Sequence, residues 1–392
     1  MASAPRLDVD QIIADPTTKI VICCGSGGVG KTTVSAALAL RAAEAGRKVV
    51  VLTIDPAKRL AQSLGVGQLD NTPRRVSGFD ETAGGSLDAM MLDMKRTFDE
   101  VVLEHTTADK AQAILANPFY VALSSSFAGT QEYMAMERLG QLHAEAEATQ
   151  SWDLIVVDTP PARSALDFLD APEHLSSLLD GRFLRILLAP TRGPFRLMSA
   201  GFSLVSAALN KVLGSQVLTD LQTFIAAFEA LFGGFRQRAM ETFTLLSSAN
   251  TTFFVVAAPE HDALREAAFF VDRLSEEKMP LSGLVINRVH ASEVAISAER
   301  AVALAEDLAR AGERRDEQDG VRPVEIEALR RHAALMRTIA RERLLLERFS
   351  ATRPSVPRTM VPAMPSDVTD LASLRRVGSL LADQDVAPRA DV

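Results

Sequence analysis

The stretch Gly25-Ser26-Gly27-Gly28-Val29-Gly30-Lys31-Thr32-Thr33 decides the fold of this chain. It follows the apolar run KIVICC at residues 19–24 and precedes the run VSAALAL at residues 34–40, which has the composition of a helix start. A strand, a glycine-rich turn and a helix in that order are the context in which the pattern G-x-x-x-x-G-K-[ST] forms a phosphate-binding loop. The glycines let the backbone N–H groups turn toward the phosphates, and the helix adds the positive end of its dipole. The alternative is a glycine turn that matches the pattern by chance.

The loop supplies a set of candidate nucleotide-binding residues, which are Gly27, Gly28, Val29, Gly30, Lys31, Thr32 and Thr33. Lys31 carries the ammonium group that reaches the β- and γ-phosphates in loops of this pattern, so it is also a candidate catalytic residue. The hydroxyl of Thr32 is a candidate ligand of Mg²⁺. The pattern therefore predicts a site for a nucleoside triphosphate, ATP or GTP.

The composition is that of an ordinary globular protein, since 47% of the 392 residues are hydrophobic and 23% are charged. The net charge of −8 gives no general attraction to nucleic acid or anionic lipid, so no nucleic-acid partner is expected. No uncharged apolar run reaches the roughly 18–20 residues of a membrane span, and the N-terminus is not a signal peptide. Cys23 and Cys24 are adjacent on an expected strand, which argues against a disulfide between them, and metal-site spacings are absent. These features predict a cytoplasmic protein without a transmembrane segment.

A second strand at residues 48–54 follows the helix expected at about 32–45, and its continuous apolar run suits a parallel strand buried on both faces. This alternation predicts an α/β fold with a mostly parallel, doubly wound sheet. Further strands are expected at residues 87–92, 152–157, 252–258, 281–287 and 358–361, and further helices at about 131–148, 262–278 and 324–349.

The domain organisation follows from these elements. We expect an N-terminal lead-in at residues 1–18, a single P-loop domain at 19–384 with helical insertions at about 95–150 and 183–248, and a disordered tail at 385–392. Two amphipathic helices at about 195–235 are rich in Phe, Leu and Met and poor in charge. They form either a packed helical subdomain or an apolar groove for a client or a membrane surface.

Polar residues at the carboxyl ends of the expected strands are further candidates, because ligands bind at this edge of parallel sheets. Asp158 ends an apolar strand downstream of the loop, which is the Walker-B pattern; the alternative is a helix N-cap. Asp55 follows the second strand, and the alternative there is a turn-forming Asp before Pro. Glu260 and Asn287 lie at or just past other strand ends, where simple strand-end caps are the alternative.

Six segments, taken in order, resemble those of one known family. They are GSGGVGKTT, TIDPAKRLAQSLG, LDAMMLDMKRTFDE, VVDTPPARSALDFL, FFVVAAPEHDALREA and GLVINRV. The chain is similar, from residue 19 to residue 370, to the arsenite-pump (ArsA-type) ATPases, a family that includes the ATPases that deliver tail-anchored membrane proteins. The resemblance implies a single-half bacterial member with a P-loop NTPase fold of the deviant-Walker class and an inserted α-helical subdomain. It also implies a dimeric, Mg²⁺-dependent ATP hydrolase with two switch segments that respond to the γ-phosphate.

Carried over position by position, the resemblance gives each catalytic candidate a role. Asp55, in the first switch, orients and deprotonates the attacking water, which suits a carboxylate at the mouth of a phosphate site. Thr32 binds Mg²⁺ directly, and Asp158 holds it through water.

The resemblance also assigns contacts outside the phosphate loop. Asn287 resembles the family's adenine contact, since an amide can both donate to and accept from the ring edge. Glu260 resembles a nucleotide contact at the dimer interface. Residues 362–367 resemble the family's loop beside the adenine.

Three features depart from the family's pattern. The family's loop begins with a signature lysine that crosses the dimer to the partner's phosphates, and this position is Ser26 here, whose hydroxyl cannot supply that charge. The partner is therefore either a second copy or a paralogous ATPase that carries the lysine. Cys23 and Cys24 cannot serve as the cysteines of the arsenite-responsive or zinc-binding members, because they lie under the loop. Ala162 and Ser164 replace the Thr and His that are more frequent near these positions of the second switch.

Three functions are open at this point. The first is an ATP-driven dimeric switch that handles a hydrophobic protein client or a membrane partner, from the cytoplasm or from the membrane periphery. The second is a spatial-positioning ATPase of the partition or division type, which the acidic net charge and the lack of a basic apolar stripe in residues 377–392 disfavour. The third is a subunit of an arsenite or anion efflux ATPase, against which the count of two cysteines argues.

Overall fold

The computed structural model describes residues 5–55, 59–118, 120, 121, 124, 130–160, 234, 237–313 and 323–383. These residues form a sheet of eight strands in the order β3-β4-β2-β5-β1-β6-β7-β8. The strands are β1 (Ile20–Cys24), β2 (Lys48–Thr53), β3 (Arg74–Arg75), β4 (Ser86–Met91), β5 (Leu154–Asp158), β6 (Thr251–Ala257), β7 (Leu281–Val289) and β8 (Arg358–Pro362). All neighbouring pairs are parallel except β3 with β4, which confirms the predicted α/β class with a mostly parallel sheet.

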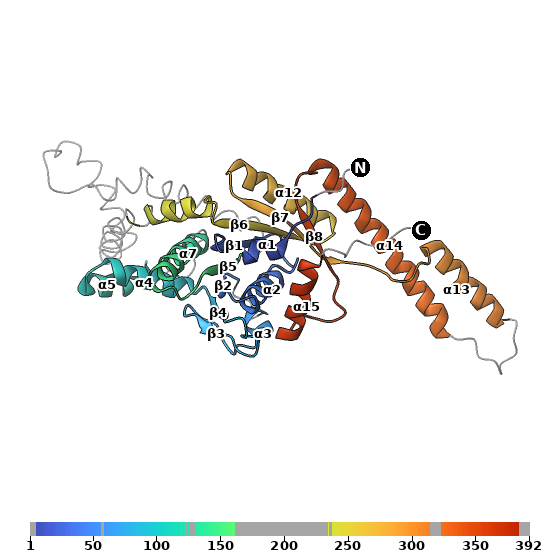
Figure 1. The fold of residues 1–392 in the computed structure, drawn as a ribbon, viewed down its shortest axis with the longest axis horizontal. Coiled ribbons are helices and arrows are strands. Elements are labelled where there is room, and N and C mark those ends of the chain that lie inside the picture. The colour runs from blue at the N-terminus through green and yellow to red at the C-terminus, as the bar shows by residue number, and fades with distance from the viewer. Residues whose placement is uncertain are drawn as a thin grey trace, which may run out of the picture.

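β1 lies inside the sheet, and all of its residues are buried, as its apolar run predicts. It pairs with β5 on one side and with β6 on the other, and β2 lies beyond β5. The register places Cys23 of β1 and Thr53 of β2 on either side of Asp158 at the end of β5. The loop that follows β1 therefore lies beside the carboxyl ends of the neighbouring strands (Figure 1).

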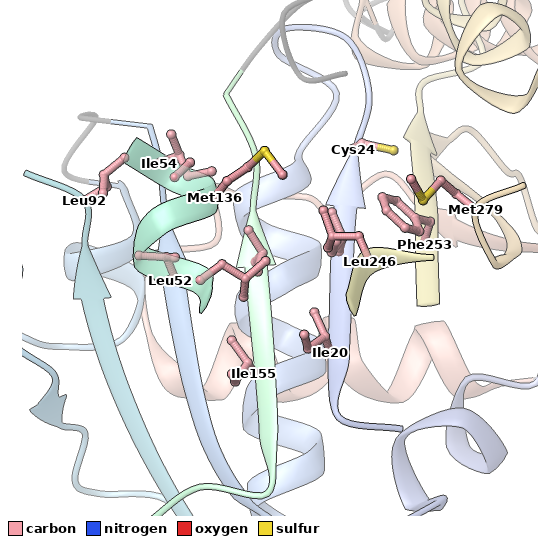
Figure 2. Packing of buried hydrophobic residues seen from close by; sticks show 14 of the residues in the cluster. Ile20, Cys24, Leu52, Ile54, Leu92, Met136, Ile155, Leu246, Phe253 and Met279 are labelled. Carbon is pink, nitrogen blue, oxygen red and sulfur yellow. The ribbon is translucent and has the colours of Figure 1, made fainter. Parts of the chain in front are cut away.

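Alternate residues of β1 enter two separate hydrophobic cores, one on each face of the sheet. Ile20 and Ile22 belong to the first core, and Val21 and Cys23 belong to the second. The first core is covered by α4 (Met94–His105), α5 (Ala108–Leu115), α7 (Thr130–Thr149) and α12 (His261–Glu276), and the second by α1 (Val9–Ala14), α2 (Lys31–Glu44), α3 (Arg59–Ser63) and α15 (Leu371–Ala382). Figure 2 shows part of the first core, with Met136 of α7 among side chains of the sheet.

α13 (Ala298–Glu313) and α14 (Pro323–Thr352) form a helical hairpin that extends away from the sheet (Figure 1). The first half of α14 packs on α13 around Ala298, Ala301 and Ala333. The second half of α14 enters the first core through Leu346 and Phe349. One continuous helix therefore joins the projecting hairpin to the body of the molecule.

A buried carboxylate ties α14 to the end of β7. Glu342 of α14 accepts a hydrogen bond from the backbone N–H of His290 at 2.9 Å, and its second oxygen lies 2.6 Å from the ring Nδ1 of the same residue. Glu342 is only 7% exposed, whereas the side chain of His290 is 42% exposed, so a buried carboxylate meets a half-exposed ring at the edge of the contact. The chain just past β7 and the middle of α14 are thereby held together.

The expected lead-in contains a short helix, α1, that the sequence did not indicate. Asp8 caps it by accepting a hydrogen bond from the backbone N–H of Gln11 at 2.9 Å. The guanidinium group of Arg47 then donates to the carbonyls of Ile13, at 2.9 Å, and Thr18, also at 2.9 Å. A helix of six residues is too short to show a periodic pattern, and contacts with the sheet stabilise it.

The predicted strands form within two residues of their expected bounds. α4, α5 and α7 lie in the helical insertion predicted at about 95–150, whereas α13 and α15 were not expected. The amphipathic helices predicted at about 195–235 and the tail at 385–392 lie outside the described residues, apart from residue 234. Among the helices that the structure describes, none has the length and apolar character that a membrane span requires.

Candidate functional site

The phosphate-binding loop turns between β1 and α2 with the backbone geometry that its glycines permit. Gly28 and Gly30 have φ values of 77° and 96°, in the left-handed region that residues with a side chain seldom adopt. A Cβ atom on Gly25 would lie 2.1 Å from the carbonyl oxygen of Val256 in β6, so the loop starts where two backbones approach closely. Gly30 is also the N-cap of α2, which places the helix dipole at the loop.

Lys31 lies inside the curve of the loop. It is 6% exposed, and its Nζ donates a hydrogen bond to the carbonyl oxygen of Ser26 at 2.8 Å. Burial lowers the pKa of Lys31, while the carboxylates of Asp158 and Asp55 act in the opposite direction. The loop and its lysine thus form one pre-organised unit with two carboxylates nearby.

Asp158 is the most buried charged group of the site, with an exposure of 0%. Its Oδ2 accepts hydrogen bonds from the hydroxyls of Thr32 at 2.7 Å and Thr53 at 2.9 Å. Burial raises its pKa to about 6, although both hydroxyls and Lys31 lower it. Within the described residues, its buried Oδ1 has no hydrogen-bond partner.

The open oxygen of Asp158 tests whether these residues fit a cation. Oδ1 of Asp158 and the hydroxyl of Thr32 are oxygen ligands, which hard divalent cations prefer. They lie beside a loop suited to phosphate, and a buried carboxylate oxygen without a donor requires a water or a cation. The residues therefore fit a divalent cation held partly through water.

Thr53 is the site residue that the sequence analysis missed. Its hydroxyl donates to Asp158 and lies 3.2 Å from the backbone N–H of Asp55, which donates to it. Thr53 is 1% exposed and therefore connects Asp158 to the backbone of Asp55, in the predicted first switch, from within the sheet. A polar residue that ends an apolar strand two positions before Asp55 is the sequence signal that could have found it.

Asp55 follows β2 and is partly exposed, at the edge of the sheet where the loop lies. Its carboxylate raises the pKa of Asp158 and counteracts the lowering of the pKa of Lys31, so it is electrostatically close to both groups. Residues 56–58, which complete the predicted first switch, lie outside the described residues.

Asn287 contacts the phosphate-binding loop from β7. Its Nδ2 donates a hydrogen bond to the carbonyl oxygen of Val29 at 2.8 Å. A Cβ atom on Gly30 would lie 2.3 Å from the same Nδ2, so the glycine leaves room for this amide. Asn287 pairs in register with Val361, and this brings it beside the segment at 362–367 that was predicted to border the adenine. The adenine contact itself stays a prediction.

The side chains of two predicted residues make no hydrogen bond to the described residues of this cluster, although the carbonyl oxygen of Ser26 accepts the hydrogen bond from Lys31. Glu260 is exposed and precedes α12 without a side-chain hydrogen bond to the helix end, so its role at a dimer interface stays a prediction. Ser26 is 8% exposed, and its hydroxyl has no hydrogen-bond partner in the part of the chain that the structure describes. Ala162 and Ser164 of the second switch lie outside the described residues.

The parallel sheet, the loop between β1 and α2, and the Thr32–Asp158 contact define a P-loop nucleoside triphosphatase. The profile of a family described as anion-transporting ATPase matches residues 18–302. The chain belongs to this family, the ArsA-type ATPases, which confirms the resemblance, and it is an ATP hydrolase.

Relatives from eukaryotes are similar over most of the chain. ATPase ASNA1 homolog 2 of Paramecium tetraurelia is 26% identical over 300 residues, covering 71% of this chain and 78% of that protein. ATPase GET3 of Lachancea thermotolerans is 26% identical over 288 residues, covering 72% and 75%. ATPase ASNA1 homolog of Entamoeba dispar is 24% identical over 293 residues, covering 74% and 82%.

Replacement of Thr53 tests whether its hydroxyl positions the site. We expect Thr53→Val to lower kcat about tenfold or more with little change in the KM for ATP, since Asp158 and the Asp55 backbone each lose a hydrogen bond. Thr53→Ser keeps the hydroxyl and should restore most of the rate. Thr252→Val, at a buried threonine of β6 bonded to Ser282, is the matched control. Equal rates for Thr53→Val and wild type would remove Thr53 from the mechanism.

The raised pKa of Asp158 predicts that its charge destabilises the nucleotide-free protein. The folded-state pKa of about 6 exceeds the usual 3.8, so protonation of Asp158 favours the folded state. This contribution to the free energy of unfolding is fully present below pH 3.8 and is lost as the pH rises through 6. Asp158→Asn should therefore raise the free energy of unfolding by up to about 3 kcal/mol at pH 8 and much less at pH 4. Thermal or urea denaturation without nucleotide measures this difference. Asp272→Asn, at an exposed aspartate, is the control and should show no such gain in stability. A gain for Asp158→Asn that is the same at pH 4 and pH 8 would contradict the assignment.

Proposed function

We propose that this ATPase is a Mg²⁺-dependent, dimeric switch whose nucleotide state is transmitted through the first switch and the end of β7. The observation that carries the proposal is the chain of contacts from Thr32 through Asp158 and Thr53 to the backbone of Asp55. It joins the phosphate-binding loop, the Walker-B strand and the first switch. A change at the γ-phosphate can therefore reach the switch backbone through two hydroxyl groups.

The residues divide the work of hydrolysis among them. The loop N–H groups and Lys31 hold the β- and γ-phosphates, and the hydroxyl of Thr32 with the open oxygen of Asp158 holds the cation site. Mg²⁺, when bound, neutralises charge on the phosphate oxygens. Asp55 orients a water in line with the γ-phosphate and accepts its proton, because it lies at the mouth of the site and is partly exposed.

A second route leads from the loop to the hairpin. The side chain of Asn287 donates a hydrogen bond to the carbonyl oxygen of Val29, and three residues later the backbone N–H of His290 donates one to Glu342 of α14. Between them, Arg288 has a φ of 62° and the pairing with β8 shifts register. An irregular strand end can adjust without breaking the sheet, so a shift of the loop on nucleotide binding can reach α14.

A hydrophobic protein client or membrane partner suits this switch better than arsenite. Cys23 and Cys24 are the only two cysteines of the chain, and both are buried with 0% exposure. Burial raises the pKa of both thiols, to about 12 for Cys23, whereas a metalloid ligand must be an accessible thiolate. The two buried thiols are therefore unsuited to bind arsenite, although the family is described as anion-transporting. We expect the ATPase rate to stay constant across an arsenite titration.

Variants of the two catalytic candidates separate binding from hydrolysis. Asp55→Asn should bind ATP and Mg²⁺ normally and lose most of the turnover, because only the proton acceptor is changed. Lys31→Ala should lose nearly all nucleotide binding, because it removes the ammonium group of the loop. Calorimetric binding and steady-state phosphate release distinguish these outcomes. Normal turnover of Asp55→Asn, or normal ATP affinity of Lys31→Ala, would refute the assigned roles.

The Asp55→Asn variant also tests the dimer. Held in Mg-ATP, it should sediment as a dimer by itself, or only after a paralogous ATPase from the source cells is added, since Ser26 replaces the signature lysine. The same variant in ADP should shift toward monomer. A monomer in both nucleotides, with no paralogue recovered, would overturn the dimeric switch while leaving the ATPase assignment intact.

A further inference from the structure

α14 carries a line of arginines along one side, which we call the arginine face: Arg330, Arg337, Arg341 and Arg348. Their spacing of seven, four and seven residues places them within about 20° of one line on a helix of 3.6 residues per turn. All four are exposed, and at a rise of 1.5 Å per residue the line is about 27 Å long. The face runs from the first half of α14, which packs on α13, into the second half, which packs on the body of the molecule.

The same helix pairs its other arginines with glutamates but not these. Arg331 binds Glu327 at 2.8 Å and Arg343 binds Glu347 at 3.1 Å, each four residues apart. For the arginine face, the described residues provide no carboxylate within ion-pair distance. Two of its members are four residues apart, where like charges destabilise a helix by a few tenths of a kcal/mol. Hydrogen bonds at Glu299 of α13 lower the pKa of this residue, and the charge of Arg337 lowers it further, but no ion pair forms between the two side chains. Within the described residues, the arginine face therefore keeps like charges side by side with only this long-range compensation.

The arginine face points away from the body of the molecule. The buried residues in the second half of α14 are Ile339, Glu342, Leu346 and Phe349, which lie on the opposite side of the helix. The positions that share the line with the arginines are not acidic; they include Ala334 and Leu344, the latter 48% exposed. A net charge of −8 for the whole chain therefore coexists with one purely basic and apolar helical face.

We propose that the arginine face docks on the anionic leaflet of a membrane, with α14 lying flat on the lipid headgroups. A planar surface can meet all four guanidinium groups at once, and each can bind a lipid phosphate in a bidentate manner. The short side chain of Ala334 lets the first half of the helix lie close to that surface. Since only Leu344 adds a large exposed apolar group, adsorption is electrostatic, reversible and sensitive to salt.

This proposal identifies a surface for the membrane option of the proposed function, and it can fail separately from it. Lipid binding is measured without nucleotide, and ATP hydrolysis is measured without lipid. If the chain hydrolyses ATP but does not bind vesicles, the docking proposal alone is overturned.

The test is sedimentation of the full chain with vesicles of about 30% phosphatidylserine in phosphatidylcholine, at about 50 mM and 300 mM salt. The wild type should bind these vesicles at low salt and neither at high salt nor to pure phosphatidylcholine. Arg337→Gln with Arg341→Gln should weaken the binding roughly 30-fold, since each arginine near an anionic surface contributes about a fivefold factor. Helix content by circular dichroism and the ATPase rate should stay unchanged.

A matched control lies on the same helix. Arg331→Gln with Arg343→Gln removes the same charge from the sides of α14, where both arginines are already paired. It should bind vesicles within about threefold of the wild type. An equal loss in both double variants would show a response to net charge only and would overturn the proposal. Absence of wild-type binding at low salt would also overturn it, and would leave an acidic protein surface as the occupant of this face.

Discussion

The site depends on burying one carboxylate, that of Asp158, inside the sheet. Asp158 ends a strand that lies between β1 and β2, where water is excluded and an unpaired charge would be costly. Two hydroxyl groups, from the first turn of α2 and from the end of β2, make this burial tolerable by donating to one oxygen. The second oxygen is left without a donor in the described residues, so the charge that costs folding free energy is also the charge that the proposed cation site needs.

This constraint explains why the surrounding fold is regular and apolar on both faces. The strands next to Asp158 must hold two hydroxyl groups within hydrogen-bond distance of one oxygen, and small errors in register would separate them. Continuous apolar runs in β1, β2 and β5 fix that register, because both cores pack against the same strands. The packing free energy of the sheet thus offsets the cost of burying the Asp158 carboxylate.

Local patterns allowed the sequence to predict much of this arrangement, since a loop such as residues 25–33 and an aspartate at a strand end are each visible within a few residues. Thr53 was not predicted, because its partner is separated from it by 105 residues and only the parallel register brings them together. The contact of Asn287 with Val29 spans 258 residues and is equally invisible locally. The short helix α1 depends on the guanidinium group of Arg47 for the same reason.

The overall charge shows a different limit of sequence reasoning. A net charge of −8 describes the field far from the molecule, but charges act over a Debye length of about 10 Å at 0.1 M salt. A surface within that distance of α14 therefore experiences the four aligned arginines rather than the average of the chain. Composition can exclude attraction to the molecule as a whole. It cannot exclude attraction to one face, because only the helical geometry brings residues seven and four positions apart into a single line.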